Sequence, residues 1–581
     1  MQYFTPNIGF LPSICTFFYI LCIVRIPLKY LCTEHKKMVM YYFIETFENT
    51  VKNCWNMPAL NDYRSEVITY GELAARIEKM HLVWKAAGLK SGDKISLNAR
   101  SSSNWATTFM AVTSGGYVSC QIFNGFTPAD TQTMVNHSDT KILFTEKVIF
   151  DGMNFEEMQQ LVAVIDMKDM TLLASRGNFA DIYMQADKLF DEAHPGGWSA
   201  DAVSYPRRSM DELCCINYTS GSTGTPKGVM LTVENISSNV DLIPRYFPYR
   251  RGDNYLSILP FAHIFGMLYD MTACLCWGMH LTVLCLPPAP SILKDALQAV
   301  TPSTVMMVPL VLKKIVEFVT AEILAENREY ALESKEFYAA MRERIMKYLG
   351  GKVEIIVTGG AALPEKLENM LIEKLALPLV TGYGMTECAP TITLGRLGHY
   401  KLKSCGVLVD CMQIKIESPD AHNVVGEVLV KGSNTFVGYY KNPAADKDVF
   451  TDDGWFRTGD LGTIDEDNNL FLVGRNKSML LGSNGENVYP EEIEVKLNVL
   501  PYVAESLIVQ RGERFVALVV PNGDQLTADN LQAEELKRIM DENISILNAT
   551  LPAFSQISGY ELCEEPFAKT PKGSIKRFRY L

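Results

Sequence analysis

The chain has 581 residues, of which 48% are hydrophobic and 21% are charged, and its formal net charge is −13. This length predicts two or more domains, and the composition is typical of a globular rather than a disordered protein. The negative charge argues against nucleic-acid binding, which needs a basic face, and against loose adhesion to anionic lipid. The 14 cysteines contain no CxxC pair, which favours a reduced cytoplasmic protein without a zinc site or a disulfide framework.

An uncharged apolar segment, residues 8–24, lies near the N-terminus and is followed by basic residues. It approaches the length of about 20 residues that a membrane-spanning helix needs, but it contains Pro12. The basic residues after it would keep the main body in the cytoplasm, and its flanks do not favour a secretory signal. Two interpretations remain open: residues 1–37 form a membrane-associating extension, or translation begins at Met38 or Met40.

Downstream, the sequence alternates between helical and strand-like segments. Thr69 and Glu72 have the spacing of a capping box, which predicts the start of a helix over residues 69–80. Strands separated by helical periods indicate parallel sheets that are buried on both faces. The apolar runs that predict these strands are residues 94–99, 141–145, 256–260, 303–309 and 353–357.

The pattern changes after about Tyr400. Shorter strands of alternating polarity, at 413–416 and 427–432, predict an antiparallel barrel-like lobe. Residues 474–492 are rich in glycine, asparagine and charge, and we interpret them as a linker. A helix from Pro490, a hairpin and a helix near 532–548 then predict a small α+β unit. The expected fold class is therefore α/β, with a large multi-lobed N-terminal domain, which combines two parallel-type sheets with that antiparallel lobe, and a small α+β C-terminal domain.

Residues 219–228 (TSGSTGTPKG) form a loop with three glycines, five hydroxyl residues and one lysine. A Walker A loop has its lysine directly after the second glycine, whereas Thr225 and Pro226 separate Gly224 from Lys227 here. The chain is therefore not expected to be an ordinary P-loop NTPase. Glycines still let backbone N–H groups approach anionic oxygens, and a lysine supplies positive charge. These features predict a phosphate site rather than a flexible surface turn.

This loop resembles the signature loop of the adenylate-forming superfamily of AMP-binding enzymes. The resemblance extends from about residue 45 over most of the chain, and among subfamilies the sequence looks most like the long-chain fatty acyl-CoA synthetases. It implies an adenylation domain over 40–474 and a mobile C-terminal domain over 478–581. Further motifs that resemble the family are PFAHIFG at 260–266, TGGAALP at 358–364, TGYGMTE at 381–387, GWFRTGD at 454–460, GRNKSMLLGSNGENVYPEEIE at 474–494 and KTPKGSIKR at 569–577.

The resemblance implies ATP, Mg²⁺ and coenzyme A as the small molecules used, and it implies roles for individual residues. Glu387 matches the residue that binds Mg²⁺, a hard cation that prefers carboxylate oxygen, and Thr386 matches a hydroxyl that contacts the α-phosphate. The implied nucleotide-binding residues are Thr219, Ser220, Gly221, Ser222, Thr223, Gly224 and Lys227 at the phosphates, Tyr383, Gly359, Gly360 and Ala361 at adenine, and Asp460 and Arg475 at the ribose. The implied acyl- and coenzyme A-lining residues are His263, Gly382, Gly384, Gly485, Glu486 and Asn487.

Two positions depart from the family pattern. Ser574 stands where the family has a lysine that bridges the substrate carboxylate and the α-phosphate. Lys572 and Lys576 lie two residues to either side, on the same side of an extended segment, and Lys572 is the candidate replacement. The other interpretation is that both lysines only solvate a basic tail. Ser478 occupies a hinge position where a charged residue is usual, and a hinge needs no particular residue type.

Three functions remain open at this point. The leading one is an ATP-dependent ligase that activates a medium- or long-chain fatty acid to acyl-AMP and transfers it to coenzyme A. The second transfers the acyl group to a carrier-protein pantetheine. The third is a catalytically weakened nucleotide- or acyl-adenylate-binding protein, which Ser574 favours. Glu387, Asp460 and Lys227 together favour an enzyme. We expect a cytoplasmic protein, with membrane association possible only through residues 8–24, and no nucleic-acid partner.

Overall fold

The computed structural model describes the chain in six stretches, residues 42–219, 226–326, 333–481, 487–512, 514–570 and 573–580. The apolar segment at 8–24 lies outside them, so its membrane association stays a prediction. Within these six stretches, no helix is long and apolar enough to cross a membrane.

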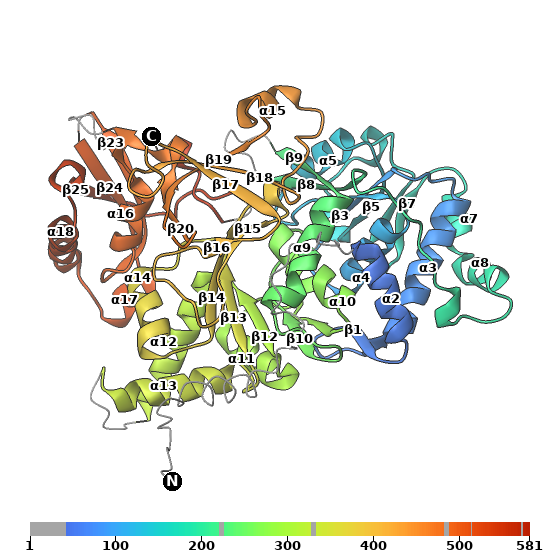
Figure 1. Cartoon of the computed structure of the whole chain (residues 1–581), viewed down its shortest axis with the longest axis horizontal. Helices are drawn as coiled ribbons and strands as arrows, with labels where there is room; N and C mark the ends of the chain where they lie inside the picture. Colours follow the sequence, from blue (N-terminus) through green and yellow to red (C-terminus); the bar gives the residue numbers. More distant parts are fainter. Residues whose placement is uncertain are drawn as a thin grey trace, which may run out of the picture. The chain divides into compact units, whose positions relative to one another are not determined.

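The largest sheet has seven strands (Figure 1). Its inner neighbours run parallel, and the edge pairs β6–β7 and β8–β9 run antiparallel. The strands predicted at 94–99 and 141–145 are confirmed as β3 and β5. In spatial order the strands are β7 (Leu172–Ser175), β6 (Ala163–Asp166), β5 (Thr140–Thr145), β3 (Lys94–Asn98), β4 (Val118–Gln121), β8 (Leu213–Thr219) and β9 (Lys227–Thr232).

The helix predicted from the capping box is confirmed as α3. Glu72 N donates to Thr69 Oγ1 at 3.2 Å, and Thr69 N donates to Glu72 Oε2 at 2.7 Å. This reciprocal pair satisfies backbone donors that the first helical turn leaves unpaired. The helices of this region are α2 (Phe43–Asn53), α3 (Tyr70–Ala86), α4 (Ser103–Ser114), α5 (Pro128–His137), α6 (Lys147–Phe150), α7 (Phe179–Tyr183), α8 (Ala186–Ala193) and α9 (Val233–Tyr246).

Two further sheets are formed by β10 to β16 together with the early strands β1 and β2. One has the order β10 (Asn254–Ser257), β11 (His280–Val283), β1 (Pro58–Asp62) and β2 (Ile68–Thr69). The other has the order β12 (Thr304–Met307), β13 (Ile355–Gly359), β14 (Leu379–Gly384), β15 (Thr391–Leu394) and β16 (Val407–Leu408). The helices whose apolar faces pack on β12 and β13 are α11 (Pro290–Val300), α12 (Pro309–Ala325) and α13 (Lys335–Tyr348) (Figure 1).

The strand predicted over 256–260 is wrong in its second half. β10 ends at Ser257, and the N–H groups of Ile258 and Leu259 donate to the buried carboxylate of Asp270 at 3.2 and 3.1 Å. A side-chain acceptor thus replaces the sheet partner that a longer strand would need, because buried backbone donors must be paired.

The predicted antiparallel lobe is confirmed. Its four strands are consecutive in space and in sequence: β17 (Met412–Glu417), β18 (Gly426–Gly432), β19 (Phe456–Ile464) and β20 (Leu470–Arg475). Helix α15 (Pro443–Val449) lies in the connection between β18 and β19.

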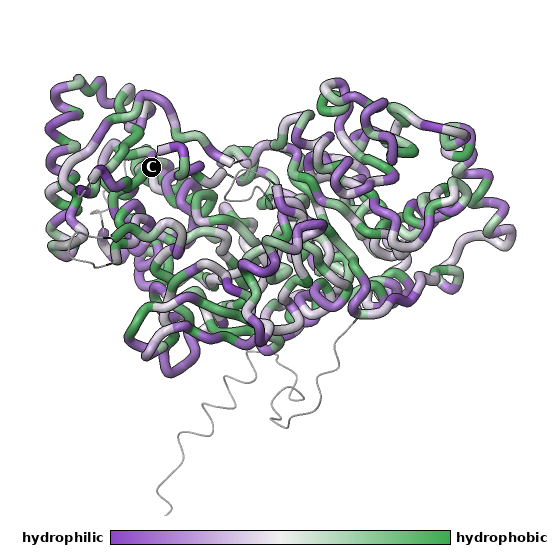
Figure 2. Tube along the Cα trace, turned by 90° about the horizontal axis from the view of Figure 1, so that it is seen from above, coloured by the Kyte–Doolittle hydropathy of each residue, from purple (hydrophilic) through white to green (hydrophobic). Residues whose placement is uncertain are grey.

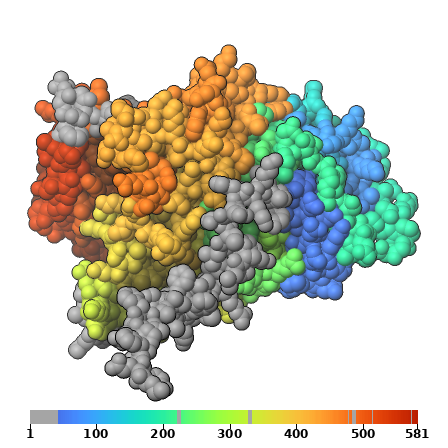
Figure 3. Space-filling model, viewed as in Figure 1, coloured from blue at the N-terminus to red at the C-terminus, as the bar shows by residue number. Residues whose placement is uncertain are grey.

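The C-terminal α+β domain is also confirmed, and its residues, coloured red, gather together in Figure 3. The segment 474–492 is more than a linker, because β21 (Leu480–Leu481) pairs with β22 (Asn487–Val488). The main elements are α16 (Pro490–Leu497), β23 (Val503–Arg511), β24 (Arg514–Pro521), α17 (Gly523–Ala528), α18 (Ala533–Ala549) and β25 (Ile557–Leu562).

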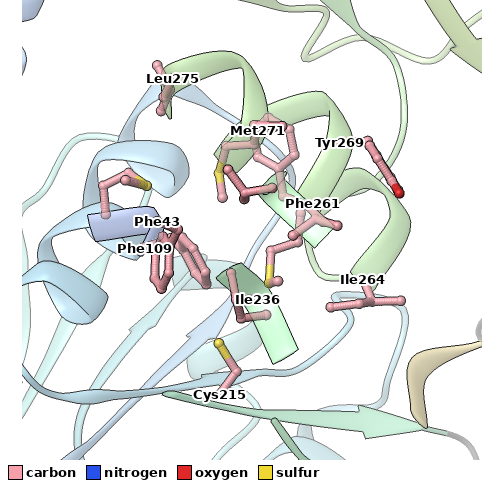
Figure 4. Close-up of a cluster of buried hydrophobic side chains, with 14 of the residues drawn as sticks. Phe43, Phe109, Cys215, Ile236, Phe261, Ile264, Tyr269, Met271 and Leu275 are labelled. Carbon is pink, nitrogen blue, oxygen red and sulfur yellow. The ribbon is translucent and has the colours of Figure 1, made fainter. Parts of the chain in front are cut away.

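The largest hydrophobic core combines buried side chains from Phe43 to Leu470. The hydropathy colouring in Figure 2 shows hydrophobic and hydrophilic stretches alternating along the trace. A π-helix, η4 (Gly266–Ala273), is buried over its whole length. Figure 4 shows Met271 from η4 converging with Phe109 from α4 and Ile236 from α9. The apolar sequence around 267–277 is therefore packed into this core.

Candidate active site

The site begins at the carboxyl ends of two neighbouring parallel strands. β13 and β14 pair in register, with Gly359 opposite Gly382. A Cβ on Gly359 would lie 2.9 Å from the Gly382 oxygen, and Gly360 has a φ of +79°, a conformation that favours glycine. Ligands of α/β sheets bind outside the carboxyl ends of such strands. The predicted adenine-binding residues Gly359, Gly360 and Tyr383 thus lie together at this edge, and Ala361 follows them in sequence.

Gly384, which ends β14, has a packing reason to be glycine. A Cβ there would lie 2.1 Å from the Pro390 carbonyl oxygen, far inside contact distance. The backbone after β14 turns back against itself at this point, into a 3-10 turn, η6 (Thr386–Cys388). The predicted Thr386 and Glu387 are presented by this turn.

Asp460 connects three elements of the site. Tyr383 on β14 donates its hydroxyl to Asp460 Oδ2 at 2.6 Å. On the other oxygen, Arg475 Nε lies 2.9 Å from Oδ1, and the two residues face each other in the register of β19 and β20. The Asp460 side chain is buried, whereas that of Arg475 is 64% exposed. Tyr383 and Arg475 therefore both contact the Asp460 carboxylate, and all three residues were predicted to bind the nucleoside.

The charges of the site also act on one another. The pKa of Arg475 is raised first by the Asp460 carboxylate, and then by Tyr383 and Glu387. Burial, followed by the nearby Asp460 charge, raises the pKa of Tyr383 well above its ordinary value. Tyr383 therefore stays protonated and remains a donor. The η6 turn that carries Glu387 follows β14, the strand that carries Tyr383, with one residue between them, so the η6 carboxylate and the nucleoside cluster are neighbours.

Glu387 is held by a residue that the sequence did not predict. The Tyr439 hydroxyl donates to Glu387 Oε1 at 2.9 Å, and the Phe436 N–H donates to the Glu387 backbone oxygen at 2.8 Å. Burial and the Glu387 carboxylate raise the pKa of Tyr439, so its hydroxyl stays protonated. The only signal in the sequence was the aromatic pair Tyr439–Tyr440, which carries no specific chemistry by itself.

The ends of the predicted phosphate loop lie side by side. Thr219 at the end of β8 pairs with Lys227 at the start of β9, so the loop connects two adjacent antiparallel strands. The Lys227 ammonium lies 4.7 Å from the centre of the Tyr439 ring, within the range of a cation–π contact. Residues 220–225 lie outside the described stretches, so the predictions for Ser220, Gly221, Ser222, Thr223 and Gly224 stay predictions.

His263 is packed against an aromatic ring. Its own ring lies 4.9 Å from that of Phe123, and the neighbouring Ala262 oxygen accepts a hydrogen bond of 3.0 Å from Asn217 on β8. The Asp270 carboxylate, which sequence reasoning missed, fixes the backbone before this segment by accepting from Ile258 and Leu259. The Asn217 bond attaches the 260–266 segment to β8, the strand that leads into the phosphate loop.

The tail places Ser574 on an exposed turn. Thr570 N donates to the Ser574 oxygen at 2.8 Å, Ser574 N donates to Thr570 Oγ1 at 3.3 Å, and Gly573 has a φ of +84°. Lys572, Gly485 and Glu486 lie outside the described stretches, and Asn487 begins β22. The roles predicted for these four residues stay predictions.

Glu387 is the residue of this site that could hold a metal ion. Among the described residues, no group of three or more histidine, cysteine or acidic side chains is arranged to hold a metal ion. Mg²⁺ commonly uses one or two carboxylates together with substrate phosphates. Glu387, beside the lysine that begins β9, fits that mode.

Residues 47–440 match the family described as AMP-binding enzyme, and residues 477–581 match the AMP-binding enzyme C-terminal domain. The chain belongs to the AMP-binding enzyme family. The predicted resemblance and fold class are thereby confirmed. Among its relatives, this AMP-binding enzyme is 26% identical over 559 residues to the long-chain-fatty-acid–CoA ligase FadD15 of Mycobacterium bovis, covering 88% of this chain and 90% of the relative.

Other relatives of this AMP-binding enzyme use different acids. It is 25% identical over 569 residues to 4-coumarate–CoA ligase 1 of Arabidopsis thaliana, covering 94% of this chain and 92% of that one. Its fold is similar to that of the anthranilate CoA ligase AuaEII in complex with anthranoyl-AMP, with a TM-score of 0.74 and 18% identity, covering 93% of this chain and 97% of that one. The chain therefore belongs to the superfamily of adenylate-forming acyl- and aryl-CoA ligases.

Proposed function

We propose that this AMP-binding enzyme joins a medium- or long-chain fatty acid to coenzyme A through a bound acyl-AMP. The observation that carries the adenylation step is the meeting of Tyr383, Asp460 and Arg475 beside Glu387. This set offers a buried carboxylate that is already oriented, next to a carboxylate suited to a cation. The fatty-acid class is supported by the sequence motifs and by the fatty-acid-activating relative.

The chemistry explains why such a set is needed. A carboxylate resists nucleophilic attack because it is anionic and its oxygen leaves poorly, and transfer of AMP makes a mixed anhydride that a thiol attacks. Donors that are oriented in advance stabilise the charge that develops at the α-phosphate. In this proposal Asp460 accepts bonds from the ribose hydroxyls, Tyr383 lies against adenine, and Thr386 donates to the α-phosphate.

The pyrophosphate side needs positive charge. Lys227 supplies one such charge at the base of the loop 219–228. Glu387 would hold Mg²⁺, which when bound neutralises phosphate charge as the pyrophosphate leaves. Residues 485–487 are proposed to approach the pantetheine of coenzyme A in the second half-reaction, after movement of the C-terminal domain.

A second candidate function is a binding protein with weakened catalysis, and Ser574 is the observation that favours it. A serine hydroxyl cannot replace the charge of the lysine that the family places there. We propose that Lys572, two residues before Ser574 in the sequence, supplies the missing charge. If it does not, adenylate formation will be slow although nucleotide binding is retained.

The test is exchange of radiolabelled pyrophosphate into ATP by the full-length chain, without coenzyme A, using acids from acetate to oleate and 4-coumarate. Exchange that is strongest with long acids supports the proposal, and exchange only with 4-coumarate overturns the fatty-acid class. Absence of exchange with every acid, while ATP still binds, supports the binding-protein function. Adding coenzyme A or a pantetheinylated carrier protein then distinguishes the thiol acceptors by their thioester products.

A further inference from the structure

Tyr439 lies between two charged groups that come from separate parts of the chain. Its hydroxyl donates to Glu387 Oε1 at 2.9 Å, and the Lys227 ammonium lies 4.7 Å from its ring centre. The Tyr439 side chain is thus in contact with the carboxylate on η6 and with the lysine that begins β9. Only 6% of the residue is exposed.

The backbone of Tyr439 is fixed on both sides. Residues 437–440 lie along the edge strand β9, where Tyr440 N donates to the Gly228 oxygen at 2.8 Å and Met230 N donates to the Gly438 oxygen at 3.0 Å. Tyr439 N donates to Asp446 Oδ1 at 2.7 Å. Because β9 and Asp446 both hold the backbone around Tyr439, the direction of the phenol is set before any ligand binds.

The ring is fixed as well. Phe436 packs against it with ring centres 4.9 Å apart and an interplanar angle of 63°. Phe436 also donates its N–H to the backbone oxygen of Glu387 at 2.8 Å. One short segment therefore holds both the main chain and the side chain of Glu387.

We propose that Tyr439 is a positioning residue that couples the phosphate-loop lysine to the metal-holding carboxylate. Its hydroxyl directs Glu387, and its ring keeps the Lys227 ammonium on the same side of the site. The inference rests on the proposed function, because it assigns Glu387 to Mg²⁺ and Lys227 to phosphate. A carboxylate that accepts one bond from Tyr439 still has lone pairs on both oxygens for a cation.

The proposed effect of Tyr439 on Glu387 is tested by metal binding rather than by turnover. Free Mn²⁺, a paramagnetic substitute for Mg²⁺, is measured by electron paramagnetic resonance in the presence of the full-length chain and α,β-methylene-ATP, which cannot transfer AMP. Tyr439→Phe is expected to weaken Mn²⁺ binding by about tenfold, the range seen when a partner of a metal ligand is removed. Tyr440→Phe is the matched control, because Tyr440 donates to Asp139 at 2.9 Å instead, and it should leave Mn²⁺ binding unchanged.

A double variant shows whether Tyr439 acts through Glu387. If it does, Tyr439→Phe added to Glu387→Gln weakens Mn²⁺ binding no further. An additive loss in the double variant would overturn this part of the inference. Unchanged Mn²⁺ binding by Tyr439→Phe, in a wild-type background that binds Mn²⁺, would overturn it too. A wild-type chain that binds neither nucleotide nor Mn²⁺ would instead overturn the proposed function.

The proposed effect of Tyr439 on Lys227 is tested by measuring the binding of α,β-methylene-ATP with EDTA and no divalent cation. Tyr439→Phe keeps an aromatic face and should retain wild-type affinity, whereas Tyr439→Leu should lose about two- to fivefold, the strength of an ordinary cation–π contact. In a Lys227→Met background the Leu substitution should have no effect. Equal affinity of the Phe and Leu variants for the nucleotide would overturn the proposed effect on Lys227. Should the Leu variant fail to fold, Tyr439→Met, which also lacks an aromatic ring, is used in its place.

Discussion

The Tyr383 hydroxyl donates a 2.6 Å hydrogen bond to Asp460 Oδ2 although 77 residues separate them in sequence. Tyr383 lies one residue before the end of β14, and Asp460 lies on β19 in the antiparallel lobe. The bond therefore connects the two sheets at the point where the nucleoside is proposed to bind. Arg475 completes the arrangement at 2.9 Å from the other carboxylate oxygen.

Removal of this bond should weaken ATP binding. Hydrogen bonds to charged groups contribute about 1.5–3 kcal/mol, so Tyr383→Phe is expected to raise the KM for ATP by about tenfold. Asp460→Ala should raise it further, because it removes the ribose acceptor itself. The measurement is pyrophosphate exchange as a function of ATP concentration. Tyr400→Phe is a fair control, since it removes a similar 2.7 Å bond to Glu368, and an equal effect of the control would contradict the prediction.

Ser574→Lys should increase the rate of adenylate formation. The position is exposed on a turn, so a lysine fits there without displacing buried atoms. One well-placed charge near a developing anion changes a rate by about 10²-fold, and we expect a gain of at least about tenfold in exchange rate. Thioester formation from supplied acyl-AMP should stay unchanged, because the lysine serves only the first step. Lys572→Ala should lower exchange in the wild-type chain but not in Ser574→Lys.

Asp270 should make stability depend on pH. It is fully buried, and burial raises the pKa of its carboxyl from the ordinary 3.8 to about 7, against the opposing effect of the Tyr255 and Ser257 hydroxyls and of two backbone donors. An acid whose pKa is raised in the folded chain contributes most to the free energy of unfolding at low pH. This contribution declines as the pH rises from about 4 to 7.

The variant Asp270→Asn cannot ionise and lacks that decline. It should be less stable than the wild type at both pH values, since its amide cannot accept all four bonds. The gap should nevertheless shrink by about 2–3 kcal/mol between pH 5 and pH 8, at about 1.4 kcal/mol per pKa unit. Denaturation midpoints at the two pH values check this. A gap that widens toward pH 8 would show that the folded chain prefers the ionised carboxylate.

Gly384→Ala should destabilise the chain. The added Cβ would lie 2.1 Å from the Pro390 oxygen, and relief of the clash requires movement of the backbone that leads to Thr386 and Glu387. Overpacking of this kind costs about 1–3 kcal/mol. Gly523→Ala is the matched control, because a Cβ there meets nothing within 4 Å. The thermal midpoint should fall for the first variant and stay within about one degree for the second.

Local sequence patterns predicted the elements well where the structure depends on near neighbours. The Thr69–Glu72 capping box required only four residues, and the strands at β3 and β5 followed from runs of apolar side chains. The predicted strand at 256–260 failed because a carboxylate 11 residues farther on accepts the Leu259 N–H. Local strand propensity cannot predict that a distant side chain will accept a backbone hydrogen bond.

The motifs supplied most of the residues of the candidate site, because each motif keeps its chemical groups within a few residues, and the roles of these residues stay predictions. The partner of Glu387 could not be found in this way, since Tyr439 is 52 residues away and tyrosine is a residue type of intermediate burial that indicates neither core nor site. The sequence by itself determined the family, the order of the secondary structure and the inventory of charged and hydroxyl groups. The tertiary structure alone decided that Tyr383 meets Asp460 and that Tyr439 connects Lys227 to Glu387, because contacts between separate sheets depend on how the sheets pack and not on the spacing of residues along the chain.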